Sequence, residues 1–279
     1  MKTSKQLKDL INNEAKRLNL NPQVLLTRFF MERFLERLSL SKHKDNFVLK
    51  GGILISAIVG IDARMTRDMD FTIKNTPLNE NSIKNALTEI ASIGIEDATE
   101  FSLTDLSVIR EESERNGFKA KFTVEFDKTR NAIQIDITAG DAITPSEIMY
   151  NYRLLLGNRS IDIASYPIET ILAEKLESIL SRSVANTRMK DFYDCYALSK
   201  LYGNSLKRNT VLTALENTAK IRKTEFIFED VPRNIEMIRT DNSIKSSWLA
   251  YSKQFSYANG IGFDEVIHEL KILLSKINQ

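Results

Sequence analysis

Residues 47–73 read FVLKGGILISAIVGIDARMTRDMDFTI and carry the pattern that decides the fold. Gly51 and Gly52 follow a short apolar segment and open the apolar run 53–61, which is typical of a turn that starts a helix. A turn of this kind brings the backbone N–H groups of the first helical residues up to an anion such as phosphate. The sequence therefore predicts a phosphate-binding turn at Gly51 and Gly52.

Asp68 and Asp70 lie in the strand predicted after this turn. Because side chains alternate between the two faces of a strand, both carboxylates project from the same face. Two adjacent carboxylates repel each other unless a cation lies between them. Magnesium takes oxygen ligands and is often completed by substrate phosphates. The glycine turn and the acid pair together predict a magnesium–nucleotide site.

Asp136 supplies a third acid on a separate strand. Residues 131–138 read NAIQIDIT, in which isoleucines alternate with polar residues as expected for a strand with one apolar face. Asp136 then lies on the polar face, from which it can join Asp68 and Asp70 at a metal. The alternative is three solvated carboxylates at the edges of a sheet.

Periodicity elsewhere predicts helices before and after a region of mixed strands. Asn21 and Pro22 are suited to begin a helix. Residues 225–228 suit either a strand or a helix.

The predicted fold class is α/β (α+β), with N-terminal helices in a catalytic domain over 1–165 and a helical domain over 166–279. The predicted strands are 105–110, 118–126 and 132–138, and the predicted helices after residue 50 include 82–93, 168–180, 190–202, 242–255 and 263–277.

Composition excludes several classes of protein. The 279 residues are 42% hydrophobic and 27% charged, which is ordinary for a soluble globular chain, and no apolar run is long enough to span a membrane. The single cysteine, Cys195, forms no internal disulfide, and we expect a cytoplasmic protein. Two histidines, His43 and His268, disfavour a zinc site or a Ser-His-Asp hydrolase.

Residues 1–50 carry eleven Lys and Arg against five Asp and Glu, a net charge of +6. This excess suits a polyanionic substrate, although it also suits ordinary solvated surface helices.

Two further segments make the predicted class of protein more specific. Residues 171–176 read ILAEKL and residues 188–194 read RMKDFYD. The glycine turn, the acid pair and the third acid resemble the polymerase-beta-like nucleotidyltransferase superfamily. With these two segments, the region from Phe47 to Tyr202 resembles the AbiEii/AbiGii family of nucleotidyltransferase toxins, which act in type IV toxin–antitoxin and abortive phage-infection systems.

The resemblance implies roles for individual residues. The metal ligands are Asp68, Asp70 and Asp136, and these three with Lys175 and Asp191 are the catalytic residues. One departure is Ile53 directly after the turn, where many relatives have a hydroxyl residue; the next hydroxyl is Ser56. The nucleotide-binding residues are Lys50, Gly51, Gly52, Ser56, Arg67, Lys175, Arg188 and Lys190. Without the family resemblance, other interpretations of these residues stay open. Lys175 can be a surface lysine, and Asp191 and Asp194 can form a solvated face of a helix.

The implied activity is magnesium-dependent transfer of a nucleotide from a nucleoside triphosphate to a hydroxyl of RNA. The leading acceptor is the 3′ end of tRNA, whose modification blocks translation and growth, and a cognate antitoxin is the expected partner. Two alternatives stay open. The acceptor is instead a protein or a small molecule such as an aminoglycoside, or the chain is a nucleotide-binding module without catalysis.

Overall fold

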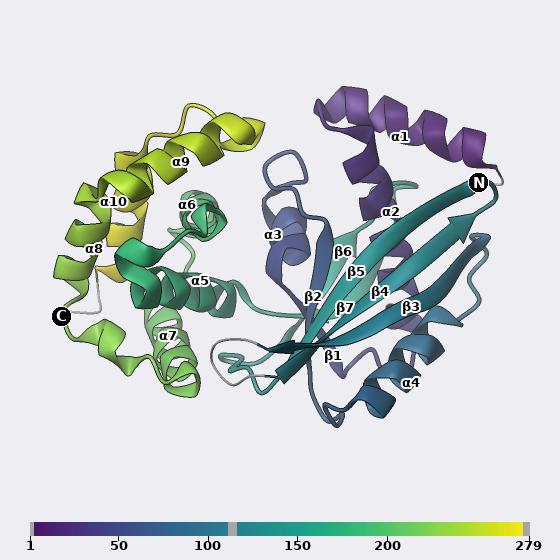
Figure 1. Cartoon of the computed structure of the whole chain (residues 1–279), viewed down its shortest axis with the longest axis horizontal. Helices are drawn as coiled ribbons and strands as arrows, with labels where there is room; N and C mark the ends of the chain where they lie inside the picture. Colours follow the sequence, from purple (N-terminus) through teal and green to yellow (C-terminus); the bar gives the residue numbers. More distant parts are fainter. Residues whose placement is uncertain (1–2, 111–115, 276–279) are drawn as a thin grey trace. The chain divides into compact units, whose positions relative to one another are not determined.

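The computed structural model describes residues 3–110 and 116–275, which fall into two compact units. The first unit comprises residues 1–140 and 148–165, and the second comprises 141–147 and 166–279. Figure 1 shows the strands gathered in the first unit and a group of helices in the second. Over the described residues, no helix combines the length and the apolar character that a membrane crossing requires.

A seven-stranded mixed sheet forms the body of the first unit, in the order β3-β4-β5-β2-β1-β7-β6 (Figure 1). The β1–β7 and β2–β5 pairs are parallel, and the other pairs are antiparallel. The mixed sheet with its helices confirms the predicted α/β class. The strands are β1 (Phe47–Lys50), β2 (Asp68–Ile73), β3 (Thr99–Arg110), β4 (Asn116–Phe126), β5 (Thr129–Ala139), β6 (Ile148–Arg153) and β7 (Ser160–Ser165).

One face of this sheet is apolar and packs against helices. Phe34 of α2 (Pro22–Leu40) contacts the rings of Phe101 on β3 and Phe122 on β4. The helix α4 (Glu80–Ala91) packs beside α2 and β3. Because residues alternate along each strand, the charged residues of β2, β4 and β5 project from the other face. The predicted start of α2 is confirmed, since the Asn21 side chain accepts a hydrogen bond from the Gln23 N–H.

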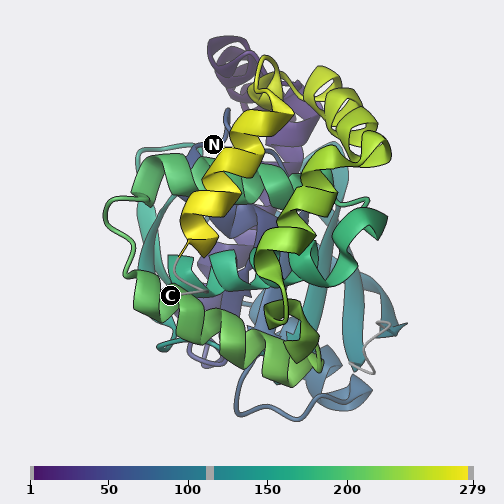
Figure 2. The same ribbon diagram turned by 90° about the vertical axis from the view of Figure 1, so that its left-hand side faces the viewer.

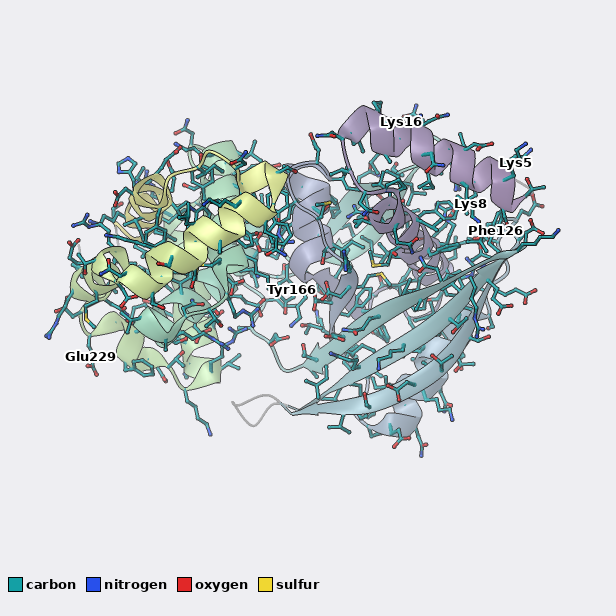
Figure 3. All side chains as sticks on the ribbon, turned by 45° about the horizontal axis from the view of Figure 1, so that its top comes forward. Lys5, Lys8, Lys16, Phe126, Tyr166 and Glu229 are labelled. Atoms are coloured by element: carbon teal, nitrogen blue, oxygen red, sulfur yellow. The ribbon has the colours of Figure 1, made fainter. Side chains whose placement is uncertain are left out.

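The helix α1 (Ser4–Leu18) is fastened at its first residue to the turn between β4 and β5. The Ser4 hydroxyl donates to the Phe126 carbonyl at 3.1 Å. Lys5, Lys8 and Lys16 extend from this helix into solvent (Figure 3). Part of the positive charge of the first fifty residues is therefore on an exposed helix surface.

The second unit is built from helices, which are coloured from green to yellow in Figure 2. Helices predicted at 168–180 and 190–202 are confirmed as α5 and α6. Residues 225–228 form a short 3₁₀ helix, not a strand. The predicted helix 263–277 is described as far as Leu274, and its residues 276 and 277 lie outside the described part. The helices are α5 (Ile168–Arg182), α6 (Met189–Tyr202), α7 (Arg208–Arg222), α8 (Val231–Thr240), α9 (Asn242–Gln254) and α10 (Phe263–Leu274).

Three strands, β1, β6 and β7, were not predicted from the sequence, and β3 begins at Thr99, earlier than the predicted residue 105. β6 and β7 have six residues each, and their short alternation carries little signal alone. They are stabilised by pairing with each other and by the parallel contact of β7 with β1, which joins residues more than one hundred positions apart.

Candidate active site

The glycine turn stands directly against the second acid of the DMD segment. Gly51 begins α3 (Gly51–Val59) with a φ of +66°, in the left-handed region that favours glycine. A Cβ atom built on Gly51 would lie 2.0 Å from Asp70 Oδ2, and one on Gly52 would lie 2.7 Å from Thr66 Oγ1. Both positions therefore require glycine. No side chain caps this helix, so its first N–H groups keep the capacity to bind an anion.

Asp70 and Asp136 occupy opposed positions on adjacent parallel strands. Their Cα atoms are register partners in the β2–β5 pair, and Asp68 lies opposite Gln134 in the same pair. Residues paired in this way share a face of the sheet, so all three carboxylates project from one side. The predicted common face is therefore present, and the third acid comes from the strand next to the acid pair.

Asp68 and Asp136 also accept hydrogen bonds from neighbouring side chains. Thr66 Oγ1 donates to Asp68 Oδ1 at 2.5 Å, and Gln134 Nε2 donates to Asp136 Oδ1 at 3.1 Å. The ammonium of Lys119 lies 3.8 Å from Asp136 Oδ2. These partners hold the carboxylates in place while leaving Asp136 with about a quarter of its side chain exposed.

The donor set fits a magnesium ion that arrives with phosphates. Within residues 3–110 and 116–275, no group of three or more His, Cys, Asp or Glu side chains is placed so that it could hold a metal ion. Magnesium keeps several waters and commonly takes only one or two carboxylates, with substrate phosphates completing its shell. Asp70 and Asp136, with Asp68 on the same face, supply carboxylate oxygens of that kind beside the glycine turn.

Among the predicted nucleotide-binding residues, Lys50 and Arg67 lie near this turn. Lys50 immediately precedes α3 and is the register partner of Asp70. Its ammonium donates to Thr138 Oγ1 at 2.8 Å. Arg67 is exposed just before β2. Both side chains therefore stay compatible with their predicted role.

The environment of Ser56 contradicts its predicted role in nucleotide binding. It is 1% exposed, and its hydroxyl accepts a hydrogen bond at 3.0 Å from Arg28, a buried arginine of α2 that also pairs with Glu32. The hydroxyl lies in the interior because Ser56 is on the inward face of α3. Ser56 therefore fastens α3 to α2 and is not available to bind a nucleotide.

Sequence reasoning missed two cations beside these groups. Arg64 is 5% exposed, and its Nη2 atom lies 3.6 Å from the Cβ position built on Gly52. It comes from an irregular loop, where no periodicity could have indicated it. Lys119 lies within the predicted strand 118–126, but only the β4–β5 register places it opposite Asp136.

The second unit contains a separate charged cluster around Asp191. This carboxylate is fully buried on α6 and accepts hydrogen bonds from Lys175 Nζ at 2.7 Å, Arg188 Nε at 2.8 Å and Ser178 Oγ at 3.2 Å. Burial by itself would raise the pKa of Asp191, but the charges of Lys175 and Arg188 outweigh it and lower the pKa to about 2. Asp191 therefore orients two basic groups.

Lys175 lies in this cluster and is not a surface lysine. Its side chain is 12% exposed, and its ammonium also lies 3.4 Å from Asp194. Arg188 and Lys190 are exposed beside the cluster. Cys195 is buried, and burial raises the pKa of its thiol well above the ordinary value, in keeping with a structural residue.

Comparison with known proteins gives a family and a fold. Residues 33–269 match the family model described as "Nucleotidyl transferase AbiEii toxin, Type IV TA system". The fold is similar to the crystal structure of a candidate nucleotidyltransferase from H. pylori, with a TM-score of 0.53 and 18% identity over 92% of this chain and 96% of that one. It is also similar to JHP933 from Helicobacter pylori, with a TM-score of 0.53 and 17% identity over 92% and 93%. No curated protein matches the sequence.

Proposed function

The chain belongs to the AbiEii nucleotidyl transferase toxin family of type IV toxin–antitoxin systems, and we propose that it transfers a nucleotide to RNA with the help of magnesium. The donor is a nucleoside triphosphate, and the 3′ end of tRNA is the leading acceptor. Adding a nucleotide there would stop aminoacylation and therefore translation and growth. A cognate antitoxin would restrain the activity.

The observation that carries the proposal is the position of the glycine turn against the acid pair. Gly51 contacts the Asp70 carboxylate, and Asp136 lies opposite Asp70 on the adjacent strand. One structural element thus offers backbone N–H groups for phosphate, and two others offer carboxylates on a single face. A triphosphate with its magnesium needs both kinds of group within a few ångströms.

Each residue then has a chemical task. The N–H groups at Gly51 and Gly52 bind the triphosphate, and the Lys50 ammonium adds positive charge beside them. Asp70 and Asp136, with Asp68 on the same face, would hold a magnesium ion, which would supply charge neutralisation for the phosphates and activation of the attacking hydroxyl. Asp136 also accepts the proton of that hydroxyl as the oxygen attacks the α-phosphorus and pyrophosphate leaves. Most of the rate enhancement comes from positioning and from stabilising charge.

In the second unit, Asp191 is proposed as a positioning residue for Lys175 and Arg188. The family resemblance assigns Lys175 and Lys190 to the triphosphate, where their charge would stabilise the leaving pyrophosphate. The short hydrogen bond from Lys175 to a buried carboxylate supports this assignment, because it fixes the direction of a flexible side chain.

The test is incubation of the purified full chain with magnesium, each labelled nucleoside triphosphate in turn and total RNA. The proposal expects label in RNA, concentrated in the tRNA fraction, and none when magnesium is chelated or when Asp70→Asn replaces the parent. Parallel reactions with an aminoglycoside and with total cellular protein examine the other acceptors. Label in one of these but not in RNA would contradict the RNA acceptor, and binding of triphosphate without any transfer would contradict catalysis.

A further inference from the structure

A row of charged residues crosses the polar face of the sheet at the level of the acid pair. Lys50 is the register partner of Asp70, Asp70 of Asp136, and Asp136 of Lys119. In the strand order β1-β2-β5-β4 these residues are neighbours, because adjacent strands of a sheet lie about 4.8 Å apart. Two carboxylates are therefore flanked by one lysine on each side.

The two lysines differ in their surroundings. Lys50 directly precedes the glycine turn and donates to Thr138. Lys119 lies two strands away from Asp70, with 35% of its side chain exposed, and approaches Asp136 only to 3.8 Å. The next residue on the same face of β4 is Lys121, which is 54% exposed and 3.5 Å from Asp105. Positive charge thus continues along β4 on the side of Asp136 that is away from the turn.

The chemistry of the reaction gives different roles to the Asp70 side and the Asp136 side of this row. In an in-line displacement at phosphorus, the attacking oxygen and the leaving oxygen stand on opposite sides of the reacting atom. The glycine turn at Asp70 marks the side of the leaving pyrophosphate. The acceptor hydroxyl must then approach from the Asp136 side, and the rest of the acceptor molecule extends beyond Asp136 towards β4.

We infer that Lys119 binds a backbone phosphate of the acceptor RNA, one of the phosphodiesters close to its reactive 3′ hydroxyl. This inference rests on the proposed function and names the residue that receives the acceptor. Lys121 extends this row of phosphate-binding lysines along β4. These two lysines favour RNA over the other acceptors, because neither an aminoglycoside nor a protein hydroxyl brings a phosphate for them to bind.

A purely structural role for Lys119 predicts something different. If its only task is to offset the negative charge of Asp136, then removing it changes the affinity of the metal-free protein for magnesium and leaves RNA binding unchanged. Acceptor binding and metal binding are therefore the two measurements that separate these roles.

The experiment compares the full-length parent with Lys119→Gln, Lys119→Arg and a matched control, Lys84→Gln. Lys84 is an exposed lysine of α4, the helix beside α2 on the apolar side of the sheet. A short RNA with a free 3′ hydroxyl is the acceptor, and its binding is measured by fluorescence anisotropy at several salt concentrations. Transfer kinetics give separate KM values for RNA and triphosphate, and calorimetry gives the affinity for magnesium.

The inference expects Lys119→Gln to raise the RNA dissociation constant and KM by about threefold to tenfold, with the triphosphate KM unchanged. The slope of the logarithm of RNA affinity against the logarithm of salt concentration should shrink by about 0.7, the contribution of one phosphate contact in a single strand. Lys119→Arg should keep the parent slope, because it keeps the charge, and Lys84→Gln should behave like the parent.

The contacted phosphate is identified by replacing each of the last three phosphodiesters in turn with an uncharged methylphosphonate. At one position the loss of affinity seen with the parent should vanish in Lys119→Gln, because the variant no longer has the partner of that charge. Unchanged RNA affinity and salt slope in Lys119→Gln would overturn the inference, whether or not magnesium affinity changes. Absence of nucleotide transfer by the parent would instead count against the proposed function, and the anisotropy comparison would still decide the role of Lys119.

Discussion

Asp70 and Asp136 are direct neighbours across the parallel β2–β5 pair, although sixty-five residues separate them in the chain. Their carboxylates share one face of the sheet, and the backbone of Gly51 stands against the first of them. Acids held this close repel one another, and a cation bound between them relieves that repulsion. A cation at this position would therefore stabilise two carboxylates that the strand register holds beside the glycine turn.

Asp70→Asn should lower nucleotide transfer by at least about 10²-fold while the protein stays folded. The substitution keeps the size of the side chain but removes the charge that we propose holds magnesium. It also lessens the repulsion with Asp136, so the thermal midpoint should be unchanged or slightly raised. Transfer assays and calorimetry on the same preparation check both statements. A lost thermal transition would show that Asp70 has a structural role.

Gly51→Ala should both destabilise the protein and abolish transfer. The positive φ alone costs about 1–2 kcal/mol for an alanine, and the new methyl group would overlap the Asp70 carboxylate. Gly140→Ala is the matched control, because Gly140 also has a positive φ, +79°, but has no atom within 4 Å of its Cβ position. Denaturant unfolding should show a larger loss for Gly51→Ala. Equal losses would mean that the contact with Asp70 is relieved without cost.

Ser56→Ala should leave triphosphate affinity unchanged and reduce the free energy of unfolding by about 1–2 kcal/mol. The Ser56 hydroxyl accepts from the buried Arg28, so its removal leaves that N–H without its acceptor. Titration calorimetry with a non-hydrolysable triphosphate and urea unfolding measure the two quantities. Weakened triphosphate binding in a variant of parental stability would restore Ser56 to the nucleotide-binding set.

Asp191→Asn should destabilise the second unit by about 3 kcal/mol at pH 7, since two basic groups lose a buried carboxylate. The pKa of Asp191 is lowered from 3.8 to about 2, so its ionisation stabilises the folded state fully above pH 4. That contribution, on the order of 2 kcal/mol, is lost as the pH falls through about 2. The difference between parent and variant should therefore narrow between pH 4 and pH 2.

The single tryptophan, Trp248, provides the readout for this prediction. It is 2% exposed, belongs to the second unit and donates through its indole N–H to the Ile261 carbonyl. Its fluorescence during urea unfolding reports the unit that contains Asp191. A stability difference that stays constant from pH 7 to pH 2.5 would contradict the lowered pKa.

Lys175→Met should weaken triphosphate binding by roughly tenfold or more, because a charged hydrogen bond to phosphate is lost. Lys175→Arg should restore the affinity only in part, since a forked guanidinium does not replace a compact ammonium between Asp191 and Asp194. Calorimetric titration with magnesium and a non-hydrolysable triphosphate measures the affinity, and Trp248 fluorescence verifies folding. A folded Lys175→Met with parental affinity would leave Lys175 as a structural counter-charge for Asp191.

Features that depend on residues close together in the chain could be predicted from the sequence alone. The glycine turn follows from the requirement of a positive φ, which Gly51 meets. The shared face of Asp68 and Asp70 follows from the alternation of side chains in a strand, and the helices at 168–180 and 190–202 follow from the spacing of apolar residues. In each case the cause acts over a few residues, so the pattern can be recognised without the fold.

Contacts between residues from distant parts of the chain depend on the tertiary fold and could not be predicted in this way. Strand register places Asp136 opposite Asp70 and brings Lys119 beside Asp136, and alternation does not specify which strands pair or with what offset. Ser56 was misassigned for the same reason, because its burial depends on Arg28 of a separate helix. Long-range pairing is selected by the packing of the whole apolar face at once, and no short stretch of sequence contains that information.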